Sequence, residues 1–363
     1  MLENVLEGKN ALFETGMQTV LRGQENRYRR IVVQNGNVVQ NARSEQNGVS
    51  ANVYKNGVNG FASIAEYTGA AAEQVLKAAT ENAQYLNKYT RNKKAALPDY
   101  RTGWITSKGV ILDIEQKKLV DMCMEIDAYI GKTYPKLSNR MVIYREDTME
   151  KIIYTSDACN GHVVYPRFAL YVVIGMESKE GEPLELTECF GGYGNINDNP
   201  VPMKEVQEKV ERLYKRICDK AEGVYAEAGV KTVILDSDVA GMIAHEAVGH
   251  TVEADLVLGG SVAASNLGKQ VASEKISIVD YAHTVGEEMA PLPVFLDDEG
   301  VKAKDAVLVE NGKLTGYMNN RETAGHFGVE PCGNARAREF SDEPLIRMRN
   351  TLVLPGNDKL EDM

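Results

Sequence analysis

Short apolar segments typical of strands recur along the first two hundred residues of the chain. They lie at 31–34, 49–54, 141–144, 152–155, 163–173 and 184–190. Between the earliest of them the dipeptide Asn-Gly occurs four times, at Asn35-Gly36, Asn47-Gly48, Asn56-Gly57 and Asn59-Gly60. Asn-Gly tolerates the positive φ angles that tight hairpin turns demand. The pattern therefore predicts an antiparallel meander in this part of the chain.

Three further segments place apolar residues three and four positions apart, which is the spacing of an amphipathic helix. They predict helices over residues 68–86, 115–130 and 203–228. Gly229 follows the third segment and suits a helix C-terminus. We place a domain boundary on this helix, near residue 225.

Beyond the boundary the pattern changes to short strands separated by glycines. Residues 232–235 predict an apolar strand, Ser237 or Asp238 can cap a helix over 239–256, and Asn311-Gly312 predicts a hairpin. A last strand is predicted over 345–354. The predicted fold class is α+β, with an N-terminal antiparallel sheet and helices in residues 1–225 and a mostly β C-terminal domain in residues 226–363.

Composition narrows the classes of function. The chain has 363 residues and 41 Lys+Arg against 52 Asp+Glu, a net charge of −11, which disfavours binding to nucleic acid or to an anionic membrane. Its longest apolar run, 168–176, is far shorter than the roughly 20 residues of a spanning helix. Five cysteines, an odd number without C-x-x-C spacing, favour a reducing compartment, so we expect a cytoplasmic protein.

The segment 245–250 carries the residue types of a metal site, because His245 and His250 flank Glu246 in an H-E-x-x-x-H pattern. The composition predicts about 0.01 such matches by chance. Neutral imidazoles bind Zn²⁺, and a neighbouring glutamate can take a proton from zinc-bound water. Glu246 is therefore the candidate general base and His245 and His250 the candidate ligands. The alternative is two unrelated histidines.

The spacing of the two histidines differs from the H-E-x-x-H pattern of common zinc proteases. Four residues along a helix leave two side chains about 40° apart, whereas five leave them about 140° apart. A regular helix cannot aim His245 and His250 at one ion. We therefore expect the helix to widen into a π-type turn or to end before His250, and Gly249 makes either easier.

These residues and the segments around them resemble the TldD/PmbA family of zinc peptidases. The resemblance continues through residues 251–255, 268–273, 276–280, 297–300, 333–338 and 347–351, and the Asn-Gly meander is similar to the family's N-terminal domain. It implies a zinc-dependent peptidase that cuts extended or unfolded peptides, with His245 and His250 as zinc ligands and Glu246 as the base. It also implies a homodimer, or a heterodimer with a relative that lacks the motif.

The resemblance further implies a third zinc ligand, a cysteine in a Gly-x-Cys-Gly-Lys segment beyond residue 354. That segment does not occur in these 363 residues, so we expect a family member truncated at its C-terminus. The sequence leaves open whether a chain without this ligand is active or inactive. The substitutes within the chain are Cys332, His326, His283 and Glu253. Glu253 and Asp255 could instead orient an imidazole, although an exposed helix face explains them equally well.

Two other features have plainer interpretations. Residues 297–300, Asp-Asp-Glu-Gly, lack the ligand count of a calcium loop and predict a turn. The glycines around 191–194 precede Pro200 and Pro202, which argues against a dinucleotide-binding helix. The alternative function is a non-catalytic protein-binding regulator, or a partner subunit of a TldD-type heterodimer.

Overall fold

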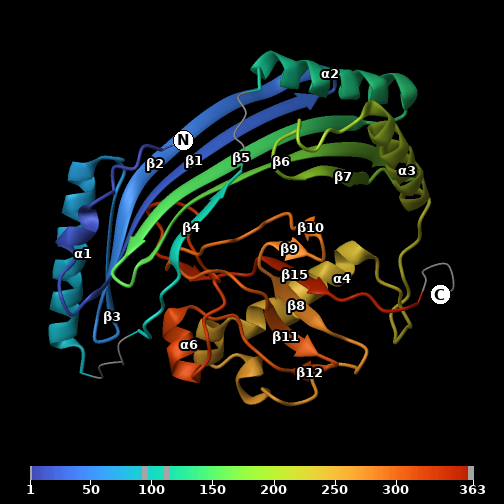
Figure 1. Ribbon diagram of the computed structural model, residues 1–363. Coiled ribbons are helices and arrows are strands. Elements are labelled where there is room, and N and C mark those ends of the chain that lie inside the picture. The colour runs from blue at the N-terminus through green and yellow to red at the C-terminus, as the bar shows by residue number, and fades with distance from the viewer. Residues whose placement is uncertain (1, 92–96, 110–113, 359–363) are drawn as a thin grey trace.

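A long curved sheet forms the N-terminal part of the chain and arches over a smaller C-terminal part (Figure 1). This computed structural model describes residues 2–91, 97–109 and 114–358. The strands of the sheet are β1 (Gln18–Gln34), β2 (Asn37–Lys55), β3 (Val58–Ile64), β4 (Gly103–Lys108), β5 (Asn139–Thr155), β6 (Cys159–Glu177) and β7 (Pro183–Tyr193). Their order is β3-β2-β1-β5-β6-β4, and β7 pairs with the other half of β6. All pairs are antiparallel except β4 with β6, so the predicted α+β class is confirmed.

Two of the four Asn-Gly pairs make the predicted hairpin turns. Asn35-Gly36 joins β1 to β2 and Asn56-Gly57 joins β2 to β3, and all four residues have positive φ. The other two pairs lie inside β2 and β3, so the prediction of turns there is wrong. A Cβ on Gly48 would lie 2.4 Å from the Phe340 ring, and one on Gly60 would lie 2.3 Å from the backbone oxygen of Ala79. These glycines permit close packing rather than a turn.

Three amphipathic helices cover the outer, convex side of the sheet (Figure 1). They are α1 (Gly69–Tyr89), α2 (Gln116–Thr133) and α3 (Met203–Ala221), which agree with the predicted helices except at their ends. The third ends at Ala221 rather than at residue 228, because the apolar stripe ends with Ile217 and the following side chains are mostly exposed. The predicted boundary near residue 225 falls in the irregular segment 222–236, and this division into domains stays a prediction.

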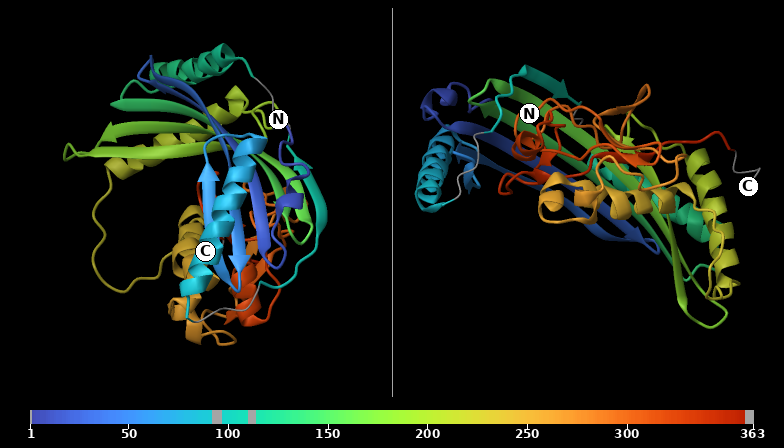
Figure 2. Two further views of the ribbon diagram at one scale, coloured as in Figure 1. Left: turned by 90° about the vertical axis from the view of Figure 1, so that its left-hand side faces the viewer. Right: turned by 90° about the horizontal axis from the view of Figure 1, so that it is seen from below.

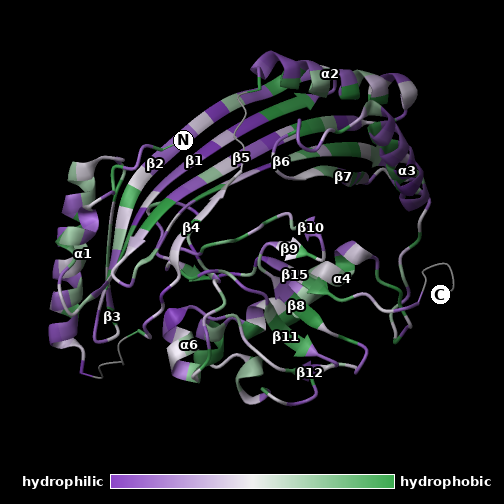
Figure 3. Ribbon diagram, viewed as in Figure 1, coloured by the Kyte–Doolittle hydropathy of each residue, from purple (hydrophilic) through white to green (hydrophobic). Residues whose placement is uncertain are grey.

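Apolar and polar residues alternate along the strands, so the two faces of the sheet differ in polarity (Figure 3). Leu21 and Ile31 of β1 belong to the apolar clusters under the helices. On the opposite, concave face, Gln24 and Asn26 donate hydrogen bonds to the backbone oxygen of Arg338, at 2.7 Å each. The concave face is therefore an interface with the C-terminal part, which lies beneath it (Figure 2).

The C-terminal part has its own small core around a sheet in the order β12-β11-β8-β15. Its elements are α4 (Ser237–Ile243), α5 (Ala254–Leu258), β8 (Ile278–Tyr281), β9 (Thr284–Val285), β10 (Glu288–Met289), β11 (Ala306–Glu310), β12 (Lys313–Leu314), α6 (Arg321–Phe327), β13 (Ala335–Arg336), β14 (Leu345–Ile346) and β15 (Asn350–Val353). The hairpin at Asn311-Gly312 is confirmed, and the predicted strand over 345–354 is two short strands. The strand predicted over 232–235 is wrong: these residues pair with no described strand, and Val233 is 67% exposed.

A buried ion pair joins the sheet to the C-terminal part. Nζ of Lys151 on β5 lies 2.7 and 2.6 Å from the two carboxylate oxygens of Asp298, and Nη1 of Arg22 on β1 lies 3.3 Å from the same carboxylate. Burial lowers the pKa of Lys151 to about 8. Burial alone would raise the pKa of Asp298, but the charges of Lys151 and Arg22 outweigh it and lower that pKa. Both partners are therefore charged at neutral pH.

No helix in the described ranges is long and apolar enough to cross a membrane. The five cysteines are free thiols.

Candidate metal centre

The metal motif lies on a helical segment whose geometry changes along its length. Oδ1 of Asp236 accepts a hydrogen bond from the backbone N–H of Val239 at 3.0 Å, so Asp236 is the N-cap rather than Ser237 or Asp238. Helix α4 then widens into a π turn over Ala244–Gly249, tightens into a 3₁₀ turn over His250–Val252 and continues as α5. The predicted departure from a regular helix is confirmed.

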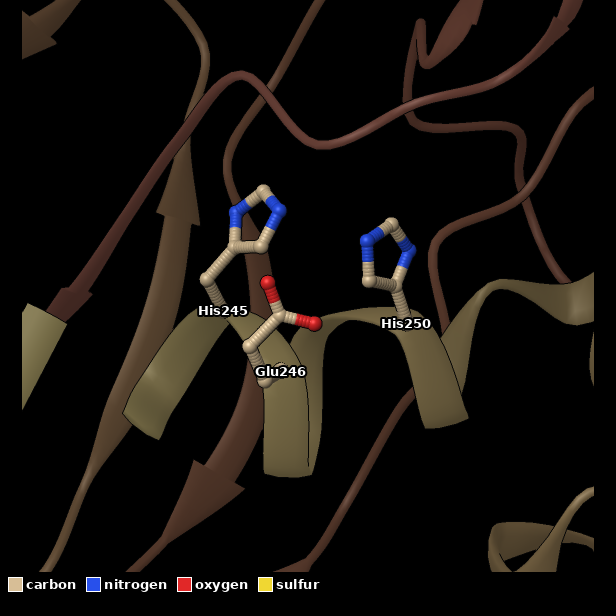
Figure 4. Close-up of side chains that lie close together, drawn as sticks. All are labelled: His245, Glu246 and His250. Atoms are coloured by element: carbon tan, nitrogen blue, oxygen red, sulfur yellow. The ribbon is translucent and has the colours of Figure 1, made fainter. Parts of the chain in front are cut away.

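The π turn brings the two imidazoles of the motif together. Their ring centroids are 4.8 Å apart and the rings are nearly perpendicular, at 84°. One ligand atom from each of His245, Glu246 and His250 lies within 4.8 Å of the others, and Figure 4 shows the carboxyl group of Glu246 beside both rings. His245 and Glu246 are exposed and His250 is half-buried, so the three groups are open to solvent and substrate.

Gly249 permits the close approach of another segment to this turn. Its φ of −49° is ordinary helical backbone, so a special conformation is not the reason for glycine. A Cβ at this position would lie 2.0 Å from Sδ of Met348, which is 8% exposed and packs in the C-terminal core. The segment that precedes β15 therefore supports the π turn from beneath.

Replacing Gly249 by Ala is expected to lower the free energy of unfolding by about 1–3 kcal/mol, because Met348 must move out of a packed core. Urea unfolding measures the change. Gly241 is the matched control, since a Cβ there meets nothing within 4 Å and alanine favours the helix. Equal stabilities of the Gly249→Ala and Gly241→Ala proteins would contradict this packing.

A buried glutamate orients one of the two imidazoles. Oε1 of Glu253 lies 3.2 Å from Nδ1 of His250, and the residue is 2% exposed. Burial raises the pKa of Glu253, while His250 and Arg347 oppose the rise. An N–H on Nδ1 that donates to this carboxyl group leaves Nε2 of His250 free to bind a metal ion. Asp255 is exposed and accepts instead from the backbone N–H of Leu256, so only one of the two predicted acidic candidates contacts an imidazole.

Replacing Glu253 by Gln is expected to weaken zinc binding by about 10-fold, because loss of a carboxylate that holds a ligand histidine typically costs 10- to 100-fold. Competition with a zinc-sensitive dye measures the affinity. Asp255→Asn removes a charge two residues away without touching His250 and is expected to leave the affinity unchanged. A Glu253→Gln protein with unchanged zinc affinity would show that the contact orients nothing.

The other candidate ligands lie elsewhere. In the described part of the chain the metal cluster contains only His245, Glu246 and His250, so it includes no third imidazole or thiolate. Cys332 is buried in the C-terminal core, where burial raises the pKa of its thiol. The His283 ring stacks on Phe295 at 4.9 Å, and the His326 ring, in the last turn of α6, lies 5.0 Å from the Phe327 ring.

Residues 297–300 form the predicted turn, and their carboxylates accept hydrogen bonds or form ion pairs within the protein. Oδ1 of Asp297 accepts from the backbone N–H groups of Glu299 and Val301, at 3.0 and 2.8 Å. Glu299 accepts from the backbone N–H of Arg321 at 2.8 Å. Since Asp298 binds Lys151, all three acidic groups already have partners within the protein.

The chain is similar to known metallopeptidases. Residues 228–363 match the PmbA/TldA metallopeptidase C-terminal domain and residues 20–83 match PmbA/TldA metallopeptidase domain 1. A metalloprotease of Methanocaldococcus jannaschii is 33% identical to this chain in an alignment that covers 99% of the chain and 78% of the relative. The chain belongs to the TldD/PmbA family of metallopeptidases.

Further relatives are similar to this chain in sequence or in fold. A zinc metalloprotease TldD homolog of Saccharolobus solfataricus is 29% identical over 69% of this chain and 54% of its own length. TldE from Thermococcus kodakarensis superposes with a TM-score of 0.66 at 16% identity, covering 99% of this chain and 78% of that one. A Thermotoga maritima protein named for modulation of a DNA gyrase gives 0.70 at 19% identity, over 95% and 76% of the two chains. At these identities the two structures show a shared fold.

Proposed function

We propose that this protein is a zinc-dependent peptidase that hydrolyses extended or unfolded peptides. The observation that carries the proposal is the π turn, which brings His245, Glu246 and His250 within 4.8 Å of one another although their spacing forbids this on a regular helix. Membership of a metallopeptidase family and a relative named a zinc metalloprotease support the same activity. The retained motif argues against a purely non-catalytic regulator or partner subunit.

The residues of the motif have separate roles in this proposal. His245 and His250 would hold the ion, and both offer the imidazole nitrogens that zinc prefers. A bound zinc ion supplies a Lewis acid and makes water acidic enough to ionise near neutral pH. Glu246, exposed beside both rings, is placed to accept the proton of the attacking water and to return it to the leaving amine.

A sheet edge beside the site could pair with an extended peptide. Among the described residues β15 is an edge strand of the C-terminal sheet, and it packs against the π turn. An extended peptide can add to such an edge through backbone hydrogen bonds, which gives loose sequence selectivity. We propose in addition that the protein works as a homodimer or as a heterodimer with a relative without the motif.

Hydrolysis of an internally quenched, unstructured peptide tests the proposal. Protein loaded with one equivalent of Zn²⁺ is expected to cleave the peptide, chelation is expected to stop cleavage, and added Zn²⁺ is expected to restore it. Cleavage that survives removal of all bound metal would refute a zinc peptidase.

A further inference from the structure

A cavity of about 240 Å³ lies between the concave face of the sheet and the C-terminal part. Tyr165 and Met149 line it from the sheet, and the segment Pro291–Val294 lines it from the other side. By the volume share of liquid water it would hold about eight water molecules, which is room for a small polar group and its neighbouring atoms. Apolar side chains such as Leu292 and Leu296 form part of its wall, and charged side chains form the rest.

Five cationic side chains line this cavity, against two acidic ones. The two carboxylates are already used: Asp147 lies 2.5 Å from Nε of Arg167, and Asp298 binds Lys151 and Arg22. The remaining cations are Arg336, Arg338 and Arg347, and within the described ranges none of them has a carboxylate at ion-pair distance. In a chain of net charge −11, this leaves a local excess of positive charge.

Arg336 shows that the cavity wall holds an unused donor. Its Nη2 donates to the backbone oxygen of Met348, but its Nε is buried and has no hydrogen-bond partner among the described residues. Burial lowers the pKa of Arg336 to about 10, so the group stays charged at neutral pH at a desolvation cost. Leaving this N–H unpaired is costly, so a movement of the guanidinium that brings it to an anion in the cavity is favoured.

Arg347 and Met348 belong to one segment that adjoins both the cavity and the metal motif. Arg347 lines the cavity and its charge lowers the pKa of Glu253, the carboxyl group that contacts His250. The next residue, Met348, is the one that packs against Gly249 of the π turn. A group bound in the cavity therefore sits beside the segment that supports the metal ligands.

We propose that this cavity is a subsite for a carboxylate of the peptide substrate, held by the guanidinium groups of Arg336, Arg338 and Arg347. The inference rests on the proposed peptidase function and specifies its substrate. Guanidinium and carboxylate match in a bidentate, charge-assisted geometry. The carboxylate comes either from the C-terminus of the peptide or from an Asp or Glu side chain, and both sources present the same chemistry.

Binding without hydrolysis tests the subsite. The Glu246→Gln protein in chelator is titrated by calorimetry with an acetylated Ala/Ser octapeptide that has a free carboxyl end, with its C-terminal amide, and with an amide that carries one central Glu. We expect at least one of the charged peptides to bind about 10-fold more tightly than the neutral amide, equivalent to about 1.4 kcal/mol. Preference for the free end assigns a C-terminal carboxylate, and preference for the Glu peptide assigns a side chain.

Matched variants locate the preference. Arg338→Gln and Arg347→Gln change exposed residues, and each is expected to reduce the preference at least three-fold. Arg216→Gln on the exposed face of α3 also removes one positive charge, but outside the cavity lining. This variant is expected to keep the preference for the charged peptides. Equal affinity for all three peptides, no measurable binding of the charged ones, or an unchanged preference in both cavity variants would overturn the subsite. Hydrolysis of the neutral amide by zinc-loaded protein with Glu246 intact tests the peptidase function separately.

Discussion

Replacing Glu246 by Gln is expected to lower kcat/KM for peptide hydrolysis by 10²- to 10⁴-fold, the range that a positioned acid–base group contributes. Gln keeps the size of the side chain but cannot accept the proton of the attacking water. Because the proposed ligands are His245 and His250, and Glu246 lies beside their imidazoles, zinc content is expected to stay unchanged. Cleavage of a quenched peptide and metal analysis of the same sample measure the two quantities.

The control for this variant is Glu274→Gln, which neutralises an exposed carboxylate outside the metal cluster. Its activity is expected to equal that of the unmodified protein. If the Glu246→Gln protein retains hydrolysis within two-fold of the unmodified protein at equal zinc content, Glu246 is not the general base.

Replacing Lys151 by Met is expected to lower the free energy of unfolding by about 3 kcal/mol, because the buried carboxylate of Asp298 then keeps only the more distant Arg22 as an ion-pair partner among the described residues. The lost ammonium also leaves the backbone oxygen of Ala337 without its 2.9 Å hydrogen bond. Since Lys151 is on the sheet and Asp298 is in the C-terminal part, the substitution weakens the contact between the sheet and the C-terminal part. Urea unfolding, followed by fluorescence of Trp104 and by circular dichroism, measures it.

The matched control is Lys117→Met, in the exposed pair that Lys117 makes with Asp121 on α2. Exposed pairs contribute little, so stability is expected to stay unchanged. Lys151→Met and Asp298→Asn are expected to be strongly non-additive, because they remove the same interaction. Additive effects, or a Lys151→Met protein as stable as the control, would show that the pair does not hold the two parts together.

The metal motif is the part of the site that can be predicted from the sequence alone. Two histidines and a glutamate within six residues are local, and helix geometry requires the helix either to widen between them or to end before His250. The structure shows the first of these two alternatives, the π turn. It adds a different reason for Gly249, which is the close approach of Met348 from a segment a hundred residues further along the chain.

Local patterns fail where partners are distant in sequence. Asn47-Gly48 has the composition of a hairpin turn, yet both residues lie in β2 and pair with β1, and the Phe340 ring packs against Gly48. The residues 232–235 have the composition of a strand and find no strand to pair with among the described residues. The ion pair of Lys151 joins residues 147 positions apart, which no periodicity reveals.

The local sequence pattern likewise does not predict that the arginines of the cavity lie together. Arg336 and Arg338 alternate with alanines, a pattern that any exposed strand could show. Only the arch of the sheet over the C-terminal part places them with Arg347 around one cavity, where no carboxylate of the described residues pairs with them.

The central claim is that His245 and His250 hold a zinc ion together, and zinc-edge X-ray absorption on the zinc-loaded protein tests it most directly. The account predicts one bound zinc whose spectrum contains two imidazole nitrogens at about 2.0–2.1 Å. It also predicts that a His245→Ala, His250→Ala protein, folded by circular dichroism, retains no zinc after dialysis. A double variant that binds zinc as tightly as the unmodified protein, or an unmodified protein whose zinc has no imidazole ligands, would contradict it.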